Sequence, residues 1–285
     1  RLDISDAFHS FQLEEDLFAD SVKAKFTILD ASDSFNKVDF DGTETIELKF
    51  ASPDQDEIDI TLQVYKTSVT PDPNSGFGKV YEIFAVTPEH FTQSTLDVNK
   101  GYIDPITSAV EDVFGMLGTK RPLDIHATTG VDRFIIPGMT PYEAMVMLQR
   151  RAYSSKYSSS VFTFYESIDG FNFHNVEELI ANNKEDAVTY AYSPTSQLDA
   201  NTKNRQFMIE KLDLKASKDV LYRIKSGSYA NQCKKLNLID QTVESGILLV
   251  NENFGDFEHL DDDDRGRNPP TLGHGTGLKT RRARN

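Results

Sequence analysis

Histidine and cysteine, which often bind metals or act in catalysis, are sparse and scattered in this sequence. No two of the six histidines are spaced as His-x-x-x-His or another short metal-ligand pair. The single cysteine, Cys233, can form no disulfide within the chain and cannot build a cysteine-based zinc site alone. Cys233 lies in a predicted strand without an identified basic activator, so we expect a buried structural thiol. The histidines are His9, His90, His126, His174, His259 and His274.

Two stretches near the C-terminus resemble ligand loops only in part. The four consecutive acids Asp261–Asp264 lack the interleaved turn residues and the glycine of a calcium loop, and fit a solvated charge run better than an ion site. The glycine-rich segment Gly273–Lys279 is not Gly-x-x-x-x-Gly-Lys-Ser/Thr and follows no strand, which favours a flexible tail. Acidic pairs suited to glycoside hydrolysis occur in any acidic chain and are uninformative. We therefore predict no catalytic residue, no metal ligand and no cofactor.

The charge of the chain is strongly negative, with 45 acidic and 30 basic residues and a net charge of −15. Affinity for nucleic acid comes largely from Lys and Arg contacts to phosphate, so specific nucleic-acid binding is not expected. The simplest role of the acid is solubility. The basic cluster Lys279–Arg284 has the opposite sign. It is either a solvated tail or an arm that docks on an acidic neighbour.

The length of 285 residues suggests two domains or one large one, and 38% hydrophobic residues supply a packed core. No apolar run approaches the roughly 18 to 20 residues that span a bilayer, and residues 1–20 lack the pattern of a secretory signal. Because the sequence begins with Arg1 rather than Met, we expect it to be part of a longer gene product. A lone cysteine fits assembly in a reducing cytoplasm.

The N-terminal third has the alternation of apolar and polar residues that is typical of strands with one buried face. Turn residues separate the strands, which favours an antiparallel barrel or sandwich. Thr87-Pro88 then predicts the start of a short helix, with Thr87 as N-cap. The predicted strands are Phe26–Asp30, Thr45–Phe50, Ile58–Tyr65 and Lys79–Val86.

The middle of the chain changes to a helical pattern. Asp104-Pro105 opens a helix that buries Ile106, Ala109, Val110, Val113, Phe114 and Leu117 and stops at Gly118. Thr140-Pro141 opens a second helix to about Tyr153, which buries Ala144, Met145, Leu148 and Ala152. A hairpin follows, with strands Val161–Tyr165 and Phe171–Phe173 around the turn pair Asp169-Gly170. The segment Val176–Ala181 predicts a short helix.

The last part of the chain predicts a second set of strands. Asp186–Tyr192 and Gln206–Leu214 read as strands, although Phe207–Leu212 also fits a helix. Ser217–Lys225 predicts a helix, and Tyr229–Leu238 and Gln241–Val250 predict strands, which together form a second and incomplete barrel. The fold class is α+β, mainly β, with tandem tube-type β-barrel modules and a smaller α/β domain between them. The predicted divisions are 1–103, 104–185, 186–260, and a flexible basic arm over 261–285.

Several segments in order resemble the baseplate hub proteins of contractile-tailed phages. The middle region has an extended proline, a Thr-Pro helix start, an Arg-Ala pair, a Phe-Tyr-Glu hairpin strand and a Gly-Phe strand. The resemblance covers most of the chain to about residue 250 as a pattern rather than a close identity. Its segments are Phe11–Phe50, Phe134–Met145, Arg150–Ala152, Phe162–Glu166, Asp169–Phe173, Ile224–Asn231 and Leu238–Asp240.

The resemblance implies a structural role. Hub subunits of this family have two tandem tube-type barrels, and three copies form a ring of pseudo-sixfold symmetry that joins a sixfold tail tube to a threefold spike. The implied partners are two further copies, tail tube or tube-initiator proteins, the central spike protein, other baseplate proteins and the tape measure protein. The implied location is the virion tail baseplate. No enzyme activity is implied.

The acidity has a second interpretation in such a ring. Three copies would carry a net charge of about −45, and acid that lines the channel would repel DNA phosphates and let DNA slide. Carboxylates that face outward would only keep the protein soluble.

Three other functions fit the sequence less well. The chain could be the hub-like part of a contractile injection spike protein, although no β-helical repeat is visible. It could be the scaffold of a tail-associated cell-wall hydrolase, which would need catalytic residues elsewhere. It could also be a carbohydrate-binding β protein, but the chain has no tryptophan.

Overall fold

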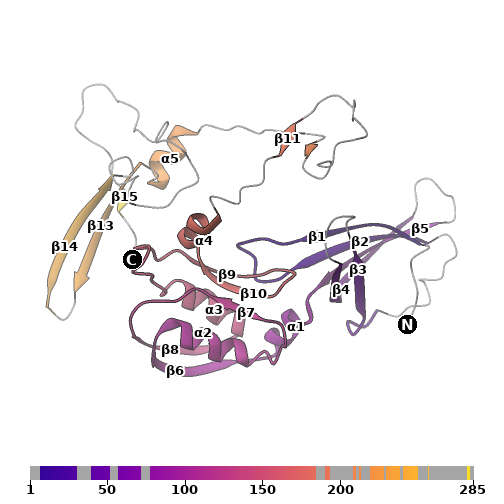
Figure 1. Ribbon diagram of the computed structural model, residues 1–285, viewed down its shortest axis with the longest axis horizontal. Coiled ribbons are helices and arrows are strands. Elements are labelled where there is room, and N and C mark those ends of the chain that lie inside the picture. Colours follow the sequence, from indigo (N-terminus) through magenta and orange to yellow (C-terminus); the bar gives the residue numbers. More distant parts are fainter. Residues whose placement is uncertain are drawn as a thin grey trace. The chain divides into compact units, whose positions relative to one another are not determined.

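The chain divides into two compact units, Arg1–Val176 and Glu177–Asn285. The computed structural model describes residues 7–30, 40–51, 57–71, 78–183, 190–192, 208–209, 212, 219–227, 229–237, 240–249, 256 and 281–282. Strands predominate over helices among these residues, as the sequence predicts (Figure 1). None of the helices described is both long enough and apolar enough to cross a membrane.

The first unit begins with a five-stranded antiparallel sheet in the order β1-β2-β5-β4-β3. All four strands predicted in this region are confirmed. The inward side chains of β2, β4 and β5 form an apolar core that includes Phe26, Leu62 and Ile83. The strands are β1 (Phe8–Glu14), β2 (Lys23–Asp30), β3 (Thr45–Phe50), β4 (Ile58–Pro71) and β5 (Lys79–Val86).

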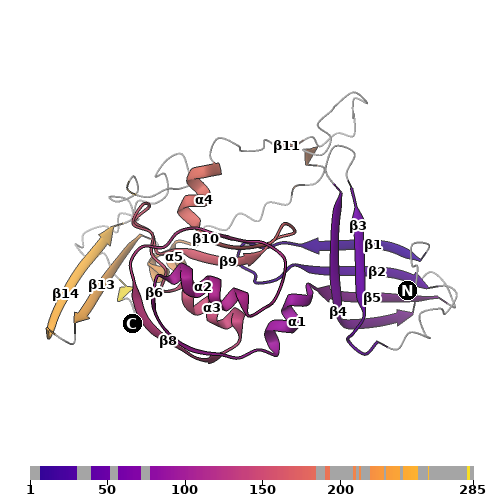
Figure 2. The same cartoon turned by 60° about the horizontal axis from the view of Figure 1, so that its bottom comes forward.

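This sheet curls because β4 is shared between two halves. The first half of β4 pairs with β3 and the second half pairs with β5, and a bulge between Val64 and Lys66 lies near the start of the second pairing. A bulge bends a strand and increases its twist. Figure 2 shows β3 and β4 running steeply across β1, β2 and β5. The two edge strands approach through Phe11 and Phe50, whose ring centroids lie 5.1 Å apart, but no backbone pairing joins them among the described residues. Closure into a tube-type barrel therefore stays a prediction.

The rest of the first unit is a helix layer held between two small sheets. Helices α2 and α3 lie between the sheet β7-β10-β9 and the two-stranded ribbon β6-β8 (Figures 1 and 2). The elements are α1 (Pro88–Ser94), β6 (Val98–Asp104), α2 (Ile106–Gly115), β7 (Leu123–Ile125), β8 (Asp132–Met139), α3 (Pro141–Gln149), β9 (Phe162–Glu166) and β10 (Phe171–Asn175).

The helix layer has its own apolar core, and the inward residues predicted for both helices occupy it. Ala109, Val110 and Val113 of α2 and Met145 and Leu148 of α3 are fully buried. Phe114 is only partly buried at its rim. The sequence also predicts where each helix begins and ends. Thr140 caps α3 in a capping box with Glu143, and Gly118 follows α2 with a φ of +64°.

The predicted hairpin is present, but its turn is shifted by one residue from the prediction. Ser167 and Gly170 exchange backbone hydrogen bonds of 2.8 and 3.3 Å, so Ile168 and Asp169 are the two turn residues. Gly170 closes the turn because a Cβ there would lie 2.6 Å from the backbone oxygen of Pro122. The glycine is thus required by a close approach rather than by the turn itself.

The second unit contains a long antiparallel hairpin, β13 (Ala230–Asn237) with β14 (Thr242–Leu249). Both strands and helix α5 (Val220–Ser226) confirm predicted elements. Two short strands, β11 (Ala191–Tyr192) and β12 (Met208–Ile209), pair in parallel. Helix α4 (Val176–Asn183) starts at the last residue of the first unit, and β15 (Arg281–Arg282) pairs with β13.

The predicted boundary between the first and second domains, at residues 103/104, falls within β6. The inward residues Val98 and Tyr102 of this strand belong to the core of the helix layer. Such packing could not be derived from the strand pattern alone. The other predicted divisions include residues outside the described ranges, so the domain scheme stays a prediction.

Candidate functional site

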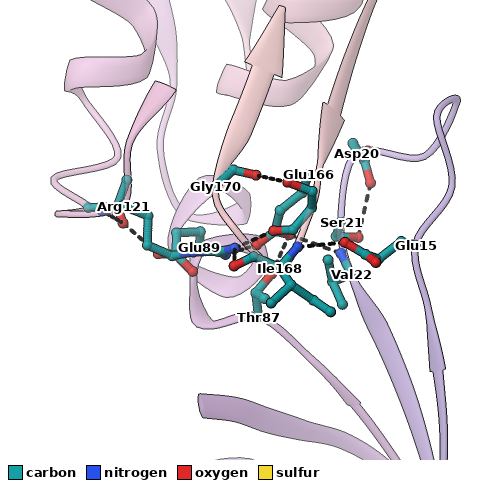
Figure 3. A network of polar contacts seen from close by, with 12 residues as sticks. Glu15, Asp20, Ser21, Val22, Thr87, Glu89, Arg121, Glu166, Ile168 and Gly170 are labelled. Atoms are coloured by element: carbon teal, nitrogen blue, oxygen red, sulfur yellow. Dashed lines mark hydrogen bonds and ion pairs between the residues drawn. The ribbon is translucent and has the colours of Figure 1, made fainter. Parts of the chain in front are cut away.

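The most concentrated polar network of the first unit surrounds Glu166, the last residue of β9. Its side chain is fully buried. One carboxylate oxygen accepts hydrogen bonds from the Val22 backbone N–H (2.9 Å) and the Thr87 hydroxyl (2.6 Å). The other forms an ion pair with the Arg121 guanidinium. Because Val22 precedes β2 and Thr87 follows β5, this group, called the joint here, connects the curled sheet to the helix layer (Figure 3).

Arg121 completes the joint with its remaining donors. Its second terminal nitrogen donates to the carbonyl oxygens of Ser167 (2.5 Å) and Ile168 (3.2 Å), in the β9–β10 turn. The guanidinium carbon lies 5.1 Å from the ring centroid of Phe171, within the range of a cation–π contact. The Arg121 side chain is 24% exposed. It therefore fixes the carboxylate and the hairpin turn at the same time.

The connection between β1 and β2 supplies a second set of contacts to the same hairpin. The Glu15 carboxylate accepts a hydrogen bond from the Ile168 backbone N–H (2.6 Å). The Leu17 carbonyl accepts one from the Thr163 hydroxyl (2.7 Å). The β9–β10 hairpin is therefore tied to the sheet at both of its ends.

Two opposing effects act on the Glu166 carboxyl. Burial raises its pKa, whereas hydrogen bonds from Thr87 and Val22 and the charge of Arg121 lower it, and burial is the larger effect. All of the described contacts of this carboxylate are to groups of the chain itself. Such an arrangement fixes the geometry of the joint.

Tyr142 of α3 lies beside the joint. Burial raises the pKa of its phenol, and the negative charges of Glu166, Glu89 and Asp20 add to this effect. Its hydroxyl is buried and has no hydrogen-bond partner among the described residues. The His90 ring packs edge-on against it, with centroids 5.9 Å apart. Tyr142 therefore packs within the core against the rings of His90 and Phe164.

A second polar cluster brings together two histidines that are far apart in the sequence. The rings of His126 and His174 stack with centroids 4.0 Å apart. His126 Nδ1 accepts a hydrogen bond from the Asn175 backbone N–H (3.1 Å). His174 contacts the Tyr165 hydroxyl through Nδ1 (3.0 Å) and the Asp124 carboxylate through Nε2 (3.1 Å). These contacts hold the residue after β7 against β10.

Two other candidate residues lie on strands. His9 is exposed on β1, and Cys233 lies on β13 opposite Gly246. The buried state predicted for the thiol stays a prediction. Within the described ranges, no group of three or more His, Cys, Asp or Glu residues is arranged to hold a metal ion.

The C-terminal candidates lie almost entirely outside the described residues. These are His259, His274, Asp261–Asp264 and Gly273–Lys279. Of the basic cluster Lys279–Arg284, only Arg281 and Arg282 are described, and they pair in parallel with β13. The docking role of this cluster stays a prediction.

The sequence contained one usable signal for the joint. Glu166 lies two residues after Phe164 and four after Phe162 on β9. Because side chains alternate between the two faces of a strand, Glu166 is expected on the same buried face as these two phenylalanines. A lone acid on an apolar face requires a cation or several donors. Nothing in the local pattern identifies Arg121 or Thr87 as those partners, because they come from other elements.

No protein-family model matches the sequence, and no curated protein matches it. Solved structures to which the chain is similar include the tail protein from Neisseria meningitidis MC58, with 12% identity over 84% of this chain and 62% of that chain and a TM-score of 0.47. The 43 kDa tail protein of prophage MuSo2 from Shewanella oneidensis is 13% identical over 64% of this chain and 51% of that chain, with a TM-score of 0.41.

A component of the E. coli type VI secretion system, described as similar in structure to the T4 bacteriophage tail proteins gp27 and gp5, is also similar. It is 8% identical over 58% of this chain and 48% of that chain, with a TM-score of 0.34. This chain spans between 48% and 62% of the length of these three proteins.

Proposed function

We propose that the chain is a non-enzymatic hub subunit of a phage tail baseplate. Three copies form a ring that joins the sixfold tail tube to the threefold central spike and leaves a channel for DNA. Its partners are the other two copies, tail tube or tube-initiator proteins, the spike and neighbouring baseplate proteins. It acts in the virion after assembly in the host cytoplasm.

The proposal is carried by one observation, which is that the sequence segments resembling hub proteins lie together in the fold. Phe134–Met145, Phe162–Glu166 and Asp169–Phe173 form β8, the start of α3 and the β9–β10 hairpin, which share one core. The conspicuous polar residues of these segments cap a helix, as Thr140 does, or hold the joint, as Glu166 does. The pattern shared with hub proteins thus has structural roles, as expected of a subunit whose function lies in its surfaces.

The curled sheet also suits a ring subunit. A strand at the edge of a sheet exposes unpaired backbone donors and acceptors. The edges β1 and β3 remain available for assembly because no strand of the described part of the chain pairs along their outer sides. In a ring, each such edge can be covered by the module that follows it.

The mass of the purified chain in solution tests the proposal. Light scattering across a dilution series, with and without the spike protein, is expected to give a trimer or trimerisation when the spike is added. A chain that stays monomeric with and without tail partners would exclude the hub function.

A further inference from the structure

Phe18 is an exposed aromatic residue held on a rigid turn. Its side chain is 75% exposed, which is unusual for a residue of this size. The turn is fixed because the Asp16 carboxylate accepts a hydrogen bond from the Phe18 backbone N–H (2.9 Å) and the Asp16 carbonyl accepts one from Ala19 (3.0 Å). The Thr163 hydroxyl donates to the Leu17 carbonyl of the same turn. The backbone of such a turn needs little further ordering when a partner docks, which favours binding.

The turn that carries this ring is rich in carboxylates. Glu14, Glu15 and Asp16, which precede Phe18 in the chain, are exposed, and Asp20, which follows it, is half-buried. The segment of residues 14–20, called the Phe18 turn, is therefore an apolar anchor in an acidic rim. The surface that best complements it is apolar and carries a positively charged side chain.

The outer face of the β6–β8 ribbon has that composition. Ile103, Val131 and Ile135 are 65%, 67% and 67% exposed. Ile103 pairs with Arg133, and Gly101 pairs with Ile135, so these side chains share the outer face. The absence of a side chain at Gly101 leaves Ile135 uncovered on that side.

Arg133 supplies the cation at the centre of this apolar row. It is exposed, and within the described ranges no carboxylate forms an ion pair with it. The nearby Arg151 differs, because its guanidinium is bonded to Asp132 (2.9 Å) and covers the Phe134 ring. The outer face of the ribbon therefore offers the positive charge of Arg133 among β-branched apolar residues.

The Phe18 turn and the ribbon cannot meet within one copy. The turn is bonded to the β9–β10 hairpin through Thr163 and Ile168. The ribbon lies on the other side of α2 and α3 (Figure 1). Two complementary surfaces on opposite sides of one unit can join only different copies. Such a head-to-tail contact closes into a ring when its rotation allows.

We propose that the Phe18 turn of one copy docks on the β6–β8 ribbon of the next copy, with Phe18 against Ile103 and Ile135 and an acidic side chain of the turn on Arg133. This assignment rests on the proposed hub function, because it names the contact between copies in the ring.

Two single variants and their mixture test the contact. Phe18→Ser damages the turn and leaves the ribbon intact, whereas Ile135→Asp damages the ribbon and leaves the turn intact. Each variant alone should associate at least about thirtyfold more weakly than the wild type, as expected for a central aromatic or apolar contact. Mixed at equal concentration, they should form a dimer, because one intact turn still finds one intact ribbon, but no trimer. Val69→Ser, which changes a 50% exposed residue of β4, is the matched control and should assemble as the wild type does.

The outcomes separate this contact from the hub function. If the wild type is trimeric and both variants remain trimeric at the same dilutions, the assigned contact is wrong while the hub function stands. If each variant is monomeric but their mixture gives no dimer, the head-to-tail arrangement is wrong. If the wild type itself stays monomeric with and without tail partners, both the contact and the hub function are wrong. Urea midpoints equal to that of the wild type exclude misfolding as the cause, since Phe18 and Ile135 are largely exposed.

Discussion

Removal of Arg121 should reveal how strongly the joint holds the first unit together. Arg121→Met keeps an apolar stem beside Phe171 but leaves the buried Glu166 carboxylate without its cation. Breaking a buried ion pair from one side costs about 3 to 5 kcal/mol, because the remaining charge stays uncompensated. The Glu166 side chain is fully buried and Arg121 is 24% exposed, so we expect a loss of about 3 kcal/mol in the free energy of unfolding at pH 7.

The double variant Arg121→Met/Glu166→Gln separates the charge from the other contacts. The glutamine amide would keep an oxygen for the hydrogen bonds from Val22 and Thr87 and would carry no charge. We expect the free energy of unfolding of this variant to lie within about 1.5 kcal/mol of the wild type, since a buried pair replaced as a whole costs little. The difference between the single and double variants measures the cost of the isolated carboxylate.

The pH dependence gives an independent check on the same residue. Burial already raises the pKa of Glu166, and the loss of the guanidinium should raise it further. A carboxyl whose pKa is higher in the folded than in the unfolded protein favours the folded protein when protonated. The destabilisation by Arg121→Met should therefore be greatest at neutral pH and shrink as the pH falls. Urea unfolding followed by far-UV circular dichroism at several pH values measures this. A loss below about 1 kcal/mol, or a loss that grows on acidification, would refute the reasoning.

Three further substitutions test the helix layer. Gly170→Ala should destabilise the first unit by about 1 to 3 kcal/mol, because its Cβ would lie 2.6 Å from the Pro122 backbone oxygen. Gly115→Ala on α2 is the control, because a Cβ there would meet no atom within 4 Å. This variant should be as stable as the wild type or more stable by up to ~1 kcal/mol. Equal urea midpoints for Gly170→Ala and Gly115→Ala would contradict the close approach of residue 170 to Pro122. Asp112→Asn should lose stability at pH 7, because a hydrogen bond from Lys100 lowers the pKa of this carboxyl and its contribution is present above the ordinary pKa. The difference from the wild type should begin to shrink below about pH 4 and be lost only as the pH falls through the lowered pKa of the folded protein. A difference that stays unchanged over this range would assign it to another cause.

The strands β2 to β5 and the helices α2 and α3 followed from local patterns. Alternation along Lys79–Val86 and helical spacing from Ile106 to Leu117 each depend on one face of one segment, so the sequence is enough to predict them. The Thr87-Pro88 signal predicts the start of α1 correctly. However, the Thr87 hydroxyl makes no cap and donates to Glu166 instead.

The joint could not be predicted because its parts come from separate segments of the chain. Val22, Thr87, Arg121 and Glu166 are brought together only when the sheet and the helix layer pack. The same holds for the stacked rings of His126 and His174, which the sequence shows as isolated histidines. Side-chain partners across elements depend on tertiary packing rather than on spacing along the chain.

Electron microscopy of the assembled tail end tests the central claim most directly. The account predicts three copies of the chain in one ring between the sixfold tail tube and the threefold spike, with the two predicted barrel modules of each copy giving pseudo-sixfold density. A map that places the chain outside this ring, or in a number other than three, would contradict it.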